Sequence, residues 1–199
     1  MPMNKTERII AWAREHGGAI TPAEVTALGA SRGNLQHLLA KGVLERGTRG
    51  VYFLQEGWPD EFYSLQARYS RGVFSHETAL YLWGLTDRTP QSFRMTFPTG
   101  YNLGRVKQAG GRCTQCLPDW HGMGVETVRT PSGCRVRVYN RERTLCDILR
   151  SRRGTDIQVV TDAFKRYASS RDKNLPRLAE YARQLGVSGK VNTYMEVLL

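Results

Sequence analysis

The segment from residue 30 to residue 54 constrains the fold most, because it compresses a helix, a turn and two strands into a short stretch. It reads ASRGNLQHLLAKGVLERGTRGVYFL. Ser31 is a suitable helix N-cap, and Gly42 suits the position just beyond a helix that ends near Lys41. Two short strands joined by a tight turn are then predicted at Val43–Arg46 and Gly50–Leu54.

Two further helices are predicted before this segment. One spans Asn4–His16 and ends at a pair of glycines. The next begins after the N-cap Thr21, with Pro22 in its first turn, and ends at Gly29. The order helix, helix, helix, strand, turn, strand predicts a winged helix-turn-helix domain over residues 1–56.

The helix of residues 31–41 has one apolar face and one polar face. At ~100° per residue, its leucines cluster on one side and should pack against the two earlier helices. The opposite side carries amides, an imidazole and cations, which can reach base edges and phosphates in DNA. The predicted DNA-contacting residues are Ser31, Arg32, Asn34, Gln36, His37 and Lys41 on the helix, and Arg46, Thr48 and Arg49 at the hairpin tip.

Charge supports a polyanionic partner but does not concentrate in this first segment. The net charge of the chain is +11, whereas residues 1–56 carry 7 Lys/Arg against 5 Asp/Glu. Residues 100–153 carry 11 against 4. A basic patch that could meet flanking DNA, RNA or an acidic protein is therefore predicted at Arg105, Lys107, Arg112, Arg129, Arg135 and Arg137. A solvated basic surface without a partner is the alternative.

The remainder of the chain, residues 57–199, predicts a mixed domain with a helical tail. A boundary is expected near GWPDE at residues 57–61. Helices are expected at 62–69, 75–84, 141–153, 155–167, 174–186 and 190–199, and strands at 93–97, 125–130 and 134–139, with a glycine-rich loop at 99–111. The fold class is thus α+β, an N-terminal winged helix-turn-helix followed by a mixed α/β C-terminal domain.

The four cysteines leave a metal site open without requiring one. Cys113 and Cys116 have the C-x2-C spacing of a zinc knuckle, and His121 and Cys134 follow. A complete zinc ribbon would need a second such pair, which is missing. No metal or cofactor is expected, and the cysteines are interpreted as free thiols near a loop. No apolar run is long enough for a membrane span, so the cytoplasm is the expected location.

Two clusters invite a catalytic interpretation, and neither is favoured. Ser75 and His76 are adjacent, and on a helix they would point ~100° apart, too far to hydrogen-bond as nucleophile and base. Glu142 and Asp147 are five residues apart, which aligns poorly on a helix, whereas Arg143 and Asp147 suit an i,i+4 ion pair. The chain is therefore expected not to be an enzyme.

Several blocks together resemble the AbiEi family of antitoxins from bacterial abortive-infection systems. The first domain ends in RGTRGVYFL, and it is followed by FSHETALYLWGLTDRTPQSFRMTFPTG and then by VRVYNRERTLCDILR. The resemblance covers about residues 5–153. The family-typical positions of the C-terminal antitoxin domain are Ser75, His76, Leu80, Leu85, Thr86, Arg141, Glu142, Arg143 and Asp147. The C-x2-C pair departs from the family pattern.

The resemblance implies two activities. The N-terminal domain would bind operator DNA and repress the antitoxin–toxin operon, with two copies on inverted repeats and a dimer on DNA. The C-terminal domain would counter a nucleotidyltransferase-like toxin of the AbiEii type, directly or functionally, as part of phage defence. Two alternatives remain: a nucleic-acid-processing enzyme targeted by a winged helix, or a winged helix that docks onto protein rather than DNA.

Overall fold

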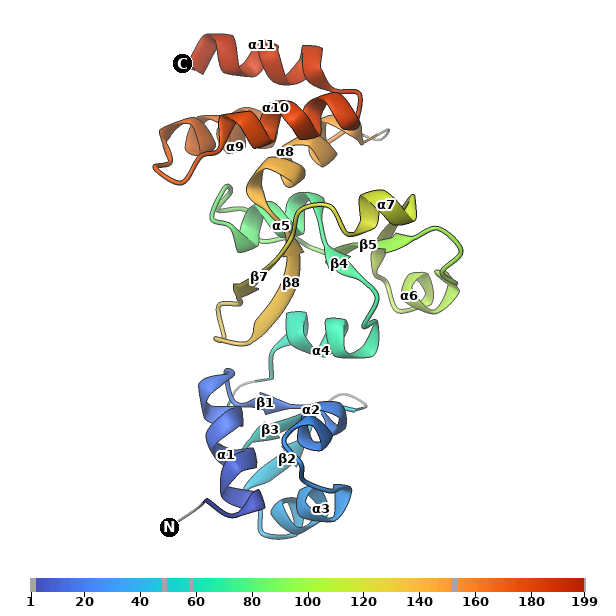
Figure 1. Ribbon diagram of the computed structural model, residues 1–199, viewed down its shortest axis with the longest axis vertical. Coiled ribbons are helices and arrows are strands. Elements are labelled where there is room, and N and C mark those ends of the chain that lie inside the picture. Colours follow the sequence, from blue (N-terminus) through green and yellow to red (C-terminus); the bar gives the residue numbers. More distant parts are fainter. Residues whose placement is uncertain (1–2, 48–49, 58, 152–153, 199) are drawn as a thin grey trace. The chain divides into compact units, whose positions relative to one another are not determined.

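Three helices and a small sheet form the N-terminal part of the computed structural model, which describes residues 3–47, 50–57, 59–151 and 154–198. The helices are α1 (Lys5–Glu15), α2 (Pro22–Ala27) and α3 (Arg32–Ala40). The strands are β1 (Ala19–Ile20), β2 (Leu44–Arg46) and β3 (Tyr52–Leu54), in the antiparallel order β1-β3-β2 (Figure 1). The predicted element order is confirmed, with β1 added.

Capping and apolar spacing explain why these short helices form. The Asn4 side chain accepts from the backbone N–H of Glu7, and Thr21 accepts from that of Glu24. Pro22 occupies the first turn of α2, where no N–H is needed. The apolar faces meet in one core, as predicted, which contains Ile9, Ala13, Ile20, Val25, Leu35, Leu38, Leu44 and Leu54.

This first compact unit extends beyond the expected boundary at residue 56. It comprises residues 1–70 and Arg129–Val136. Helix α4 (Glu61–Arg68) belongs to it: the Tyr63 hydroxyl donates to Glu24, and the hydroxyl of Thr130 donates to the buried carboxylate of Asp60. Gly17 has a φ of +76°, and a Cβ there would lie 2.4 Å from the backbone nitrogen of Cys134. These tertiary contacts join segments that are distant in the sequence.

A five-stranded sheet organises the second unit, which comprises Arg71–Val128 and Arg137–Leu199. Its strands are β4 (Val73–Phe74), β5 (Arg94–Pro98), β6 (Arg112–Cys116), β7 (Val125–Arg129) and β8 (Arg135–Tyr139), in the order β6-β5-β4-β8-β7. β5 and β6 are parallel and in register, so that Arg94 pairs with Arg112 and Thr96 with Thr114. Paired residues share a face of the sheet.

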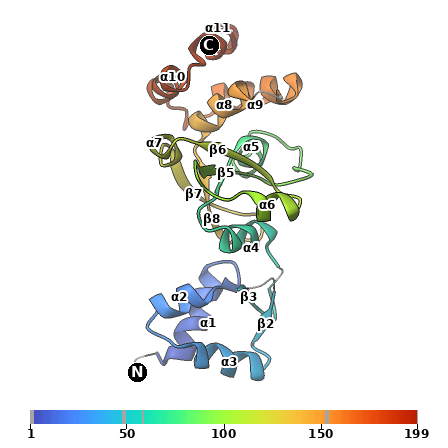
Figure 2. The same ribbon diagram turned by 90° about the vertical axis from the view of Figure 1, so that its right-hand side faces the viewer.

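Helices complete the second unit (Figure 2). They are α5 (His76–Leu82), α6 (Gly104–Gln108), α7 (Pro118–His121), α8 (Arg141–Arg150), α9 (Ile157–Ser169), α10 (Leu175–Gln184) and α11 (Ser188–Leu198). The apolar sides of α8 to α11 form a core with Leu80 and Leu85, in which Phe164 stacks on Tyr194. The coarse prediction of an α+β chain is thus confirmed: helices accompany two sheets.

Several local predictions need correction. The glycine-rich segment 99–111 contains α6, and the RCTQC sequence forms strand β6 rather than a loop. The short elements β1, β4 and α7 were not predicted. Helix α9 is capped by Asp156, whose carboxylate accepts from the N–H of Gln158, whereas the Thr155 hydroxyl donates to Glu77. None of the helices that the structure describes is long and apolar enough to cross a membrane.

Candidate nucleic-acid interface and a polar cavity

Helix α3 presents the predicted polar face. Leu35 and Leu38 are 1% exposed and Leu39 packs against the same core, so the helix is anchored by one side. The side chains of Arg32, Gln36, His37 and Lys41 are exposed. Lys41 is the C-cap residue of the helix. Four donors with different geometries therefore lie along one short helix and its end.

Ser31 and Asn34 are already engaged with each other. The amide oxygen of Asn34 accepts from both the backbone N–H and the hydroxyl of Ser31, each at 3.0 Å. This pair closes the first turn of α3, which leaves the NH₂ group of Asn34 as its remaining donor. Both residues therefore act first as helix-capping residues, a role that the sequence analysis assigned to Ser31 alone.

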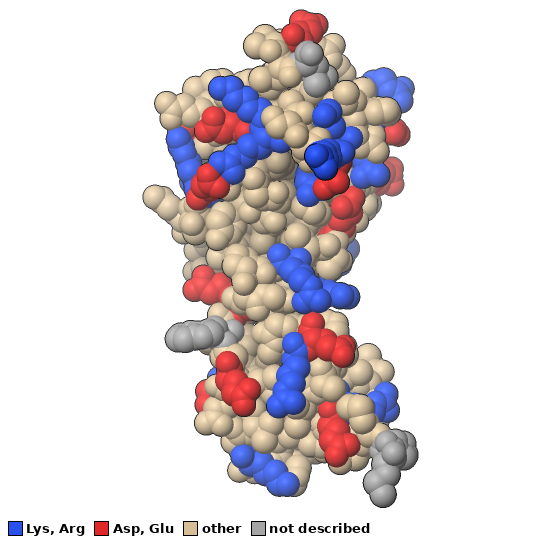
Figure 3. Space-filling view, turned by 90° about the vertical axis from the view of Figure 1, so that its left-hand side faces the viewer, with Lys and Arg blue, Asp and Glu red and all other residues tan. Residues whose placement is uncertain are grey.

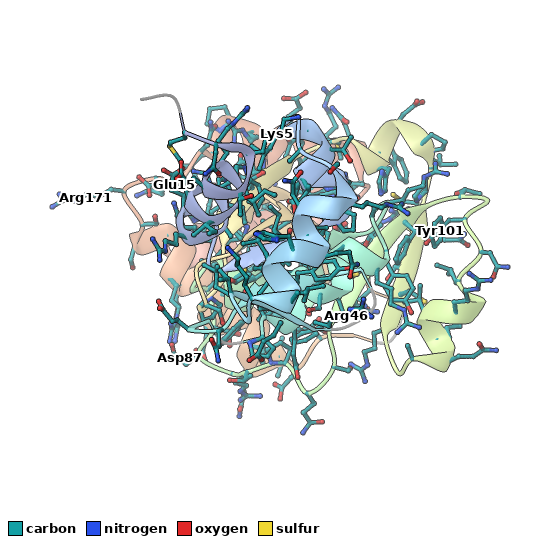
Figure 4. The ribbon with its side chains drawn as sticks, turned by 90° about the horizontal axis from the view of Figure 1, so that it is seen from below. Lys5, Glu15, Arg46, Asp87, Tyr101 and Arg171 are labelled. Atoms are coloured by element: carbon teal, nitrogen blue, oxygen red, sulfur yellow. The ribbon has the colours of Figure 1, made fainter. Side chains whose placement is uncertain are left out.

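The hairpin between β2 and β3 follows α3. Arg46 is exposed at the end of β2, and the backbone N–H of Gly47 donates to the carbonyl of Val51 across the turn. Figure 4 looks onto α3 and labels Arg46. Thr48 and Arg49, which the sequence analysis placed at the hairpin tip, lie outside the described residues.

The six residues of the predicted basic patch are distributed over both units. Arg129 and Arg135 belong to the first unit, and Arg129 donates to the carbonyl of Gly133. Arg137, half-buried in the second unit, donates to the carbonyl of Gly72. The others, Arg105, Lys107 and Arg112, are exposed on α6 and β6. On the face drawn in Figure 3, Lys and Arg are interspersed with Asp and Glu.

A polar cavity of about 790 Å³ lies within the second unit. On α8, Arg143, Asp147 and Arg150 have the i, i+4, i+7 spacing of one helix face. Strands β5 and β6 provide another wall, and the start of α5 provides a third. The lining residues are His76, Glu77, Arg94, Thr96, Lys107, Gly111, Arg112, Cys113, Thr114, Gln115, Cys116, Arg143, Asp147, Arg150, Ser151 and Gly154.

Arg143 and Asp147 form the predicted i,i+4 ion pair, and it is buried. The Nε of Arg143 lies 3.0 Å from Oδ1 of Asp147, with the two side chains 1% and 7% exposed. Arg143 also donates to the carbonyl of Trp120 at 2.7 Å and lies over the ring of Tyr139. Burial disfavours the charge of Arg143, but the charge and hydrogen bond of Asp147, together with Tyr139 and Cys116, outweigh burial and raise the arginine pKa. The second oxygen of Asp147 has no hydrogen-bond partner among the described residues.

Ser75 and His76 do form the hydrogen bond that helical geometry was expected to exclude. The two side chains are joined by a hydrogen bond of 3.1 Å between Nδ1 and Oγ. The helical angle does not apply, because Ser75 is extended and His76 has a φ of +52°. Ser75 also accepts from the Thr96 hydroxyl, and it is fully buried and absent from the cavity lining. The pair therefore does not present a serine nucleophile to the cavity.

The other family-typical positions hold the second unit together. Leu80 and Leu85 lie in its core, and the Thr86 hydroxyl accepts from the backbone N–H of Arg88. Arg141 lies over the ring of Trp83. Glu142 is buried and accepts from the hydroxyl of Tyr167. The sequence blocks around residues 75 and 143 thus supply both packing and part of the cavity.

The cysteines are free thiols in the structure. Cys113 and Cys116 lie in β6, whereas Cys134 belongs to the first unit. Burial raises the pKa of Cys116, and it raises the pKa of Cys146 to about 12. In the described parts of the chain, no three His, Cys, Asp or Glu side chains gather as a group that could hold a metal ion.

Some cavity residues were not singled out from the sequence. Glu77 and Arg94 form an ion pair at 3.2 Å across the start of α5 and β5. Burial opposes ionisation of Glu77, but its own backbone N–H and the Arg94 charge outweigh this effect and lower its pKa. Arg150 could have been predicted as a cavity residue, because it lies seven residues after Arg143 on the same face of the helix. Arg94, Thr96 and Thr114 required the register of β5 and β6.

We expect the buried His76 to make the second unit sensitive to acid. Burial lowers its pKa below the usual 6.5, against the opposing charge of Asp147. As the pH falls below 6.5 the unfolded chain takes up the proton first, so stability falls by at most ~1.4 kcal/mol per pH unit. Asparagine tolerates a positive φ. The substitution His76→Asn should therefore make the decline of Tm between pH 7 and pH 5 less steep.

In His76→Asn the dependence of Tm on pH should become weaker but should not disappear, because burial also lowers the pKa of His121. The matched control is His37→Asn on the exposed side of α3. Thermal melts of both variants across this pH range provide the measurement. An unchanged slope in His76→Asn would contradict the assignment of this proton to His76.

The comparison with known protein families found a match within the first unit. Residues 7–55 match the model of a family described as transcriptional regulator, AbiEi antitoxin. This match confirms the predicted resemblance over these residues and supports a regulator and antitoxin role. No protein among the curated sequences matches the chain.

A solved structure with a similar fold is that of the RV2827C protein from Mycobacterium tuberculosis. The two chains are 12% identical with a TM-score of 0.53, and the alignment covers 92% of this chain and 72% of the other. At this identity the similarity concerns the fold alone.

Proposed function

We propose that this protein is a DNA-binding antitoxin that represses the operon encoding itself and its toxin. The observation that carries the proposal is the exposed polar face of α3, which lies within the residues that match the regulator family. In this proposal the first unit is a winged helix-turn-helix. Helix α3 enters a major groove, and the β2–β3 hairpin contacts the backbone.

The chemistry of the exposed face suits this role. Gln36 can pair with an adenine edge, and Arg32 can pair with a guanine edge or a phosphate. Arg46, at the start of the hairpin turn, is suited to phosphate contact. Operators for such domains are often inverted repeats, so we propose that two copies bind one operator.

The antitoxin role is assigned to residues 57–199, on the basis of the resemblance. The partner would be a nucleotidyltransferase-like toxin. This chain would counteract it either by binding it in a complex or by opposing its effect in the cell without a stable complex. This assignment extends the regulator and antitoxin role suggested by the family match. We propose that the chain acts in the cytoplasm, without catalytic activity of its own.

A gel-shift titration on the DNA directly upstream of the gene tests the repressor role. Random DNA of equal length is the control. A retarded band at protein concentrations that leave the control free is the expected result. Equal affinity for both DNAs would contradict autorepression and would favour a winged helix that docks onto a protein.

A further inference from the structure

The cavity of the second unit carries an excess of positive charge that DNA reading by α3 does not explain. Its lining contains the five cations Arg94, Lys107, Arg112, Arg143 and Arg150, against the two carboxylates Glu77 and Asp147. Burial of charge is costly unless it is compensated. A lining with this imbalance therefore favours an anionic occupant.

The solvent exposure of the cationic side chains increases from the inside of the cavity to its rim. Arg143 is almost completely buried, and Arg94 is 18% exposed. Both already pair with a carboxylate, at Asp147 and Glu77 respectively. Lys107, Arg112 and Arg150 are exposed, and no carboxylate pairs with them in the described residues. The anionic end of a ligand would meet these three side chains, as phosphate groups meet arginine and lysine elsewhere.

The inner part of the cavity favours hydrogen-bond donors rather than an anion. One carboxylate oxygen of Asp147 and the hydroxyl of Thr114 are buried without a hydrogen-bond partner in the described structure. Asp147 is 5% exposed and lines the cavity, so its free oxygen is an acceptor that lacks a donor. Buried acceptors of this kind are normally satisfied. An N–H or O–H donor on a ligand would satisfy both groups.

We propose that the cavity binds a small phosphorylated molecule whose other end carries N–H or O–H donors. Nucleoside phosphates and sugar phosphates share this chemistry. The phosphate would bind at Lys107 and Arg112, and the donors would reach Thr114 and Asp147. The volume of about 790 Å³ lies within the usual range of small-molecule sites. Inorganic phosphate would contact the rim cations but has no second end that reaches Thr114 and Asp147.

Calorimetric titration of the full chain tests the proposal. The probes are ADP, ribose 5-phosphate, adenosine and inorganic phosphate, in one buffer of fixed salt concentration. We expect ADP or ribose 5-phosphate to bind more tightly than adenosine and inorganic phosphate. Comparison of the first two distinguishes a nucleoside phosphate from a sugar phosphate as the ligand class. Failure of both to bind at millimolar concentration would overturn the proposal.

Variants separate the two ends of the site. Lys107→Ala with Arg112→Ala removes exposed rim charges, and we expect binding of the phosphorylated probe to fall about tenfold or more. Thr114→Val keeps the shape and removes the hydroxyl, with an expected loss of about threefold to tenfold. Thr114→Val leaves the Arg143–Asp147 pair intact, and a thermal melt verifies that each variant is folded.

The matched control is Arg171→Ala with Arg183→Ala. Both side chains are exposed on the second unit and neither lines the cavity. The control should bind the probe as the unaltered chain does. Equal weakening in the control and the rim variant would show non-specific attraction and overturn the site. Binding of inorganic phosphate as tight as that of the phosphorylated probes would overturn the role of Thr114 and Asp147.

Discussion

Replacing Arg143 by methionine is expected to lower the free energy of unfolding of the second unit by about 3–5 kcal/mol. The substitution leaves the carboxylate of Asp147, whose side chain is 7% exposed, without its cation. It also removes the donor to the carbonyl of Trp120. The measurement is urea unfolding of the full chain, followed by fluorescence from Trp83 and Trp120, which pack against the core of this unit.

Two further variants give this prediction its control and its test. Arg88→Met removes an ion pair whose side chains are 54% and 50% exposed, and the expected cost is below ~1 kcal/mol. Arg143→Met combined with Asp147→Leu removes both buried charges and should recover part of the lost stability. A loss for Arg143→Met as small as that for Arg88→Met would contradict the structural importance of the buried pair.

Replacing Arg32 and Gln36 together by alanine is expected to abolish the preference for operator DNA. Each side chain that reads a base edge contributes ~1–3 kcal/mol to discrimination, so the loss of two should lower the preference by a factor of ~30 to ~10,000 or more. Non-specific affinity should fall less, since other cations remain. Fluorescence anisotropy with operator and random duplexes measures both affinities.

Arg46→Ala should behave differently. A residue that contacts phosphate weakens binding to all sequences alike and lowers the slope of log K against log salt by ~1. Gln55→Ala, exposed on the same unit but outside α3, is the control with unchanged binding. Neutralisation of the toxin in growth assays should survive all of these substitutions. Loss of neutralisation with intact DNA binding would instead favour a first unit that docks onto the toxin.

Local sequence signals accounted for most of the helices and for the pairing of Arg143 with Asp147. The N-cap Thr21 was identified from residue type and from the apolar spacing that follows, and the helix expected at 174–186 begins after the N-cap Asn174. The pairing of Arg143 with Asp147 follows from i,i+4 geometry, although its burial does not. Such features depend on neighbours within one or two turns, and a single sequence contains that information.

Tertiary structure decided the features that bring distant segments together. Strands β1 and β4 have two residues each and exist because neighbouring strands supply their hydrogen bonds. The positive φ of His76 made its bond to Ser75 geometrically feasible, which a helical extrapolation excluded.

Local patterns in the chain therefore predicted most of the helical segments, the polar face of α3 and the resemblance to a regulator family. The cavity shared by Arg94, Thr114 and Asp147 follows from long-range packing instead, because strand register and helix contacts bring together residues far apart in the chain. Helix periodicity and capping are local properties. The positions of cavity walls depend on long-range packing, which no local pattern encodes.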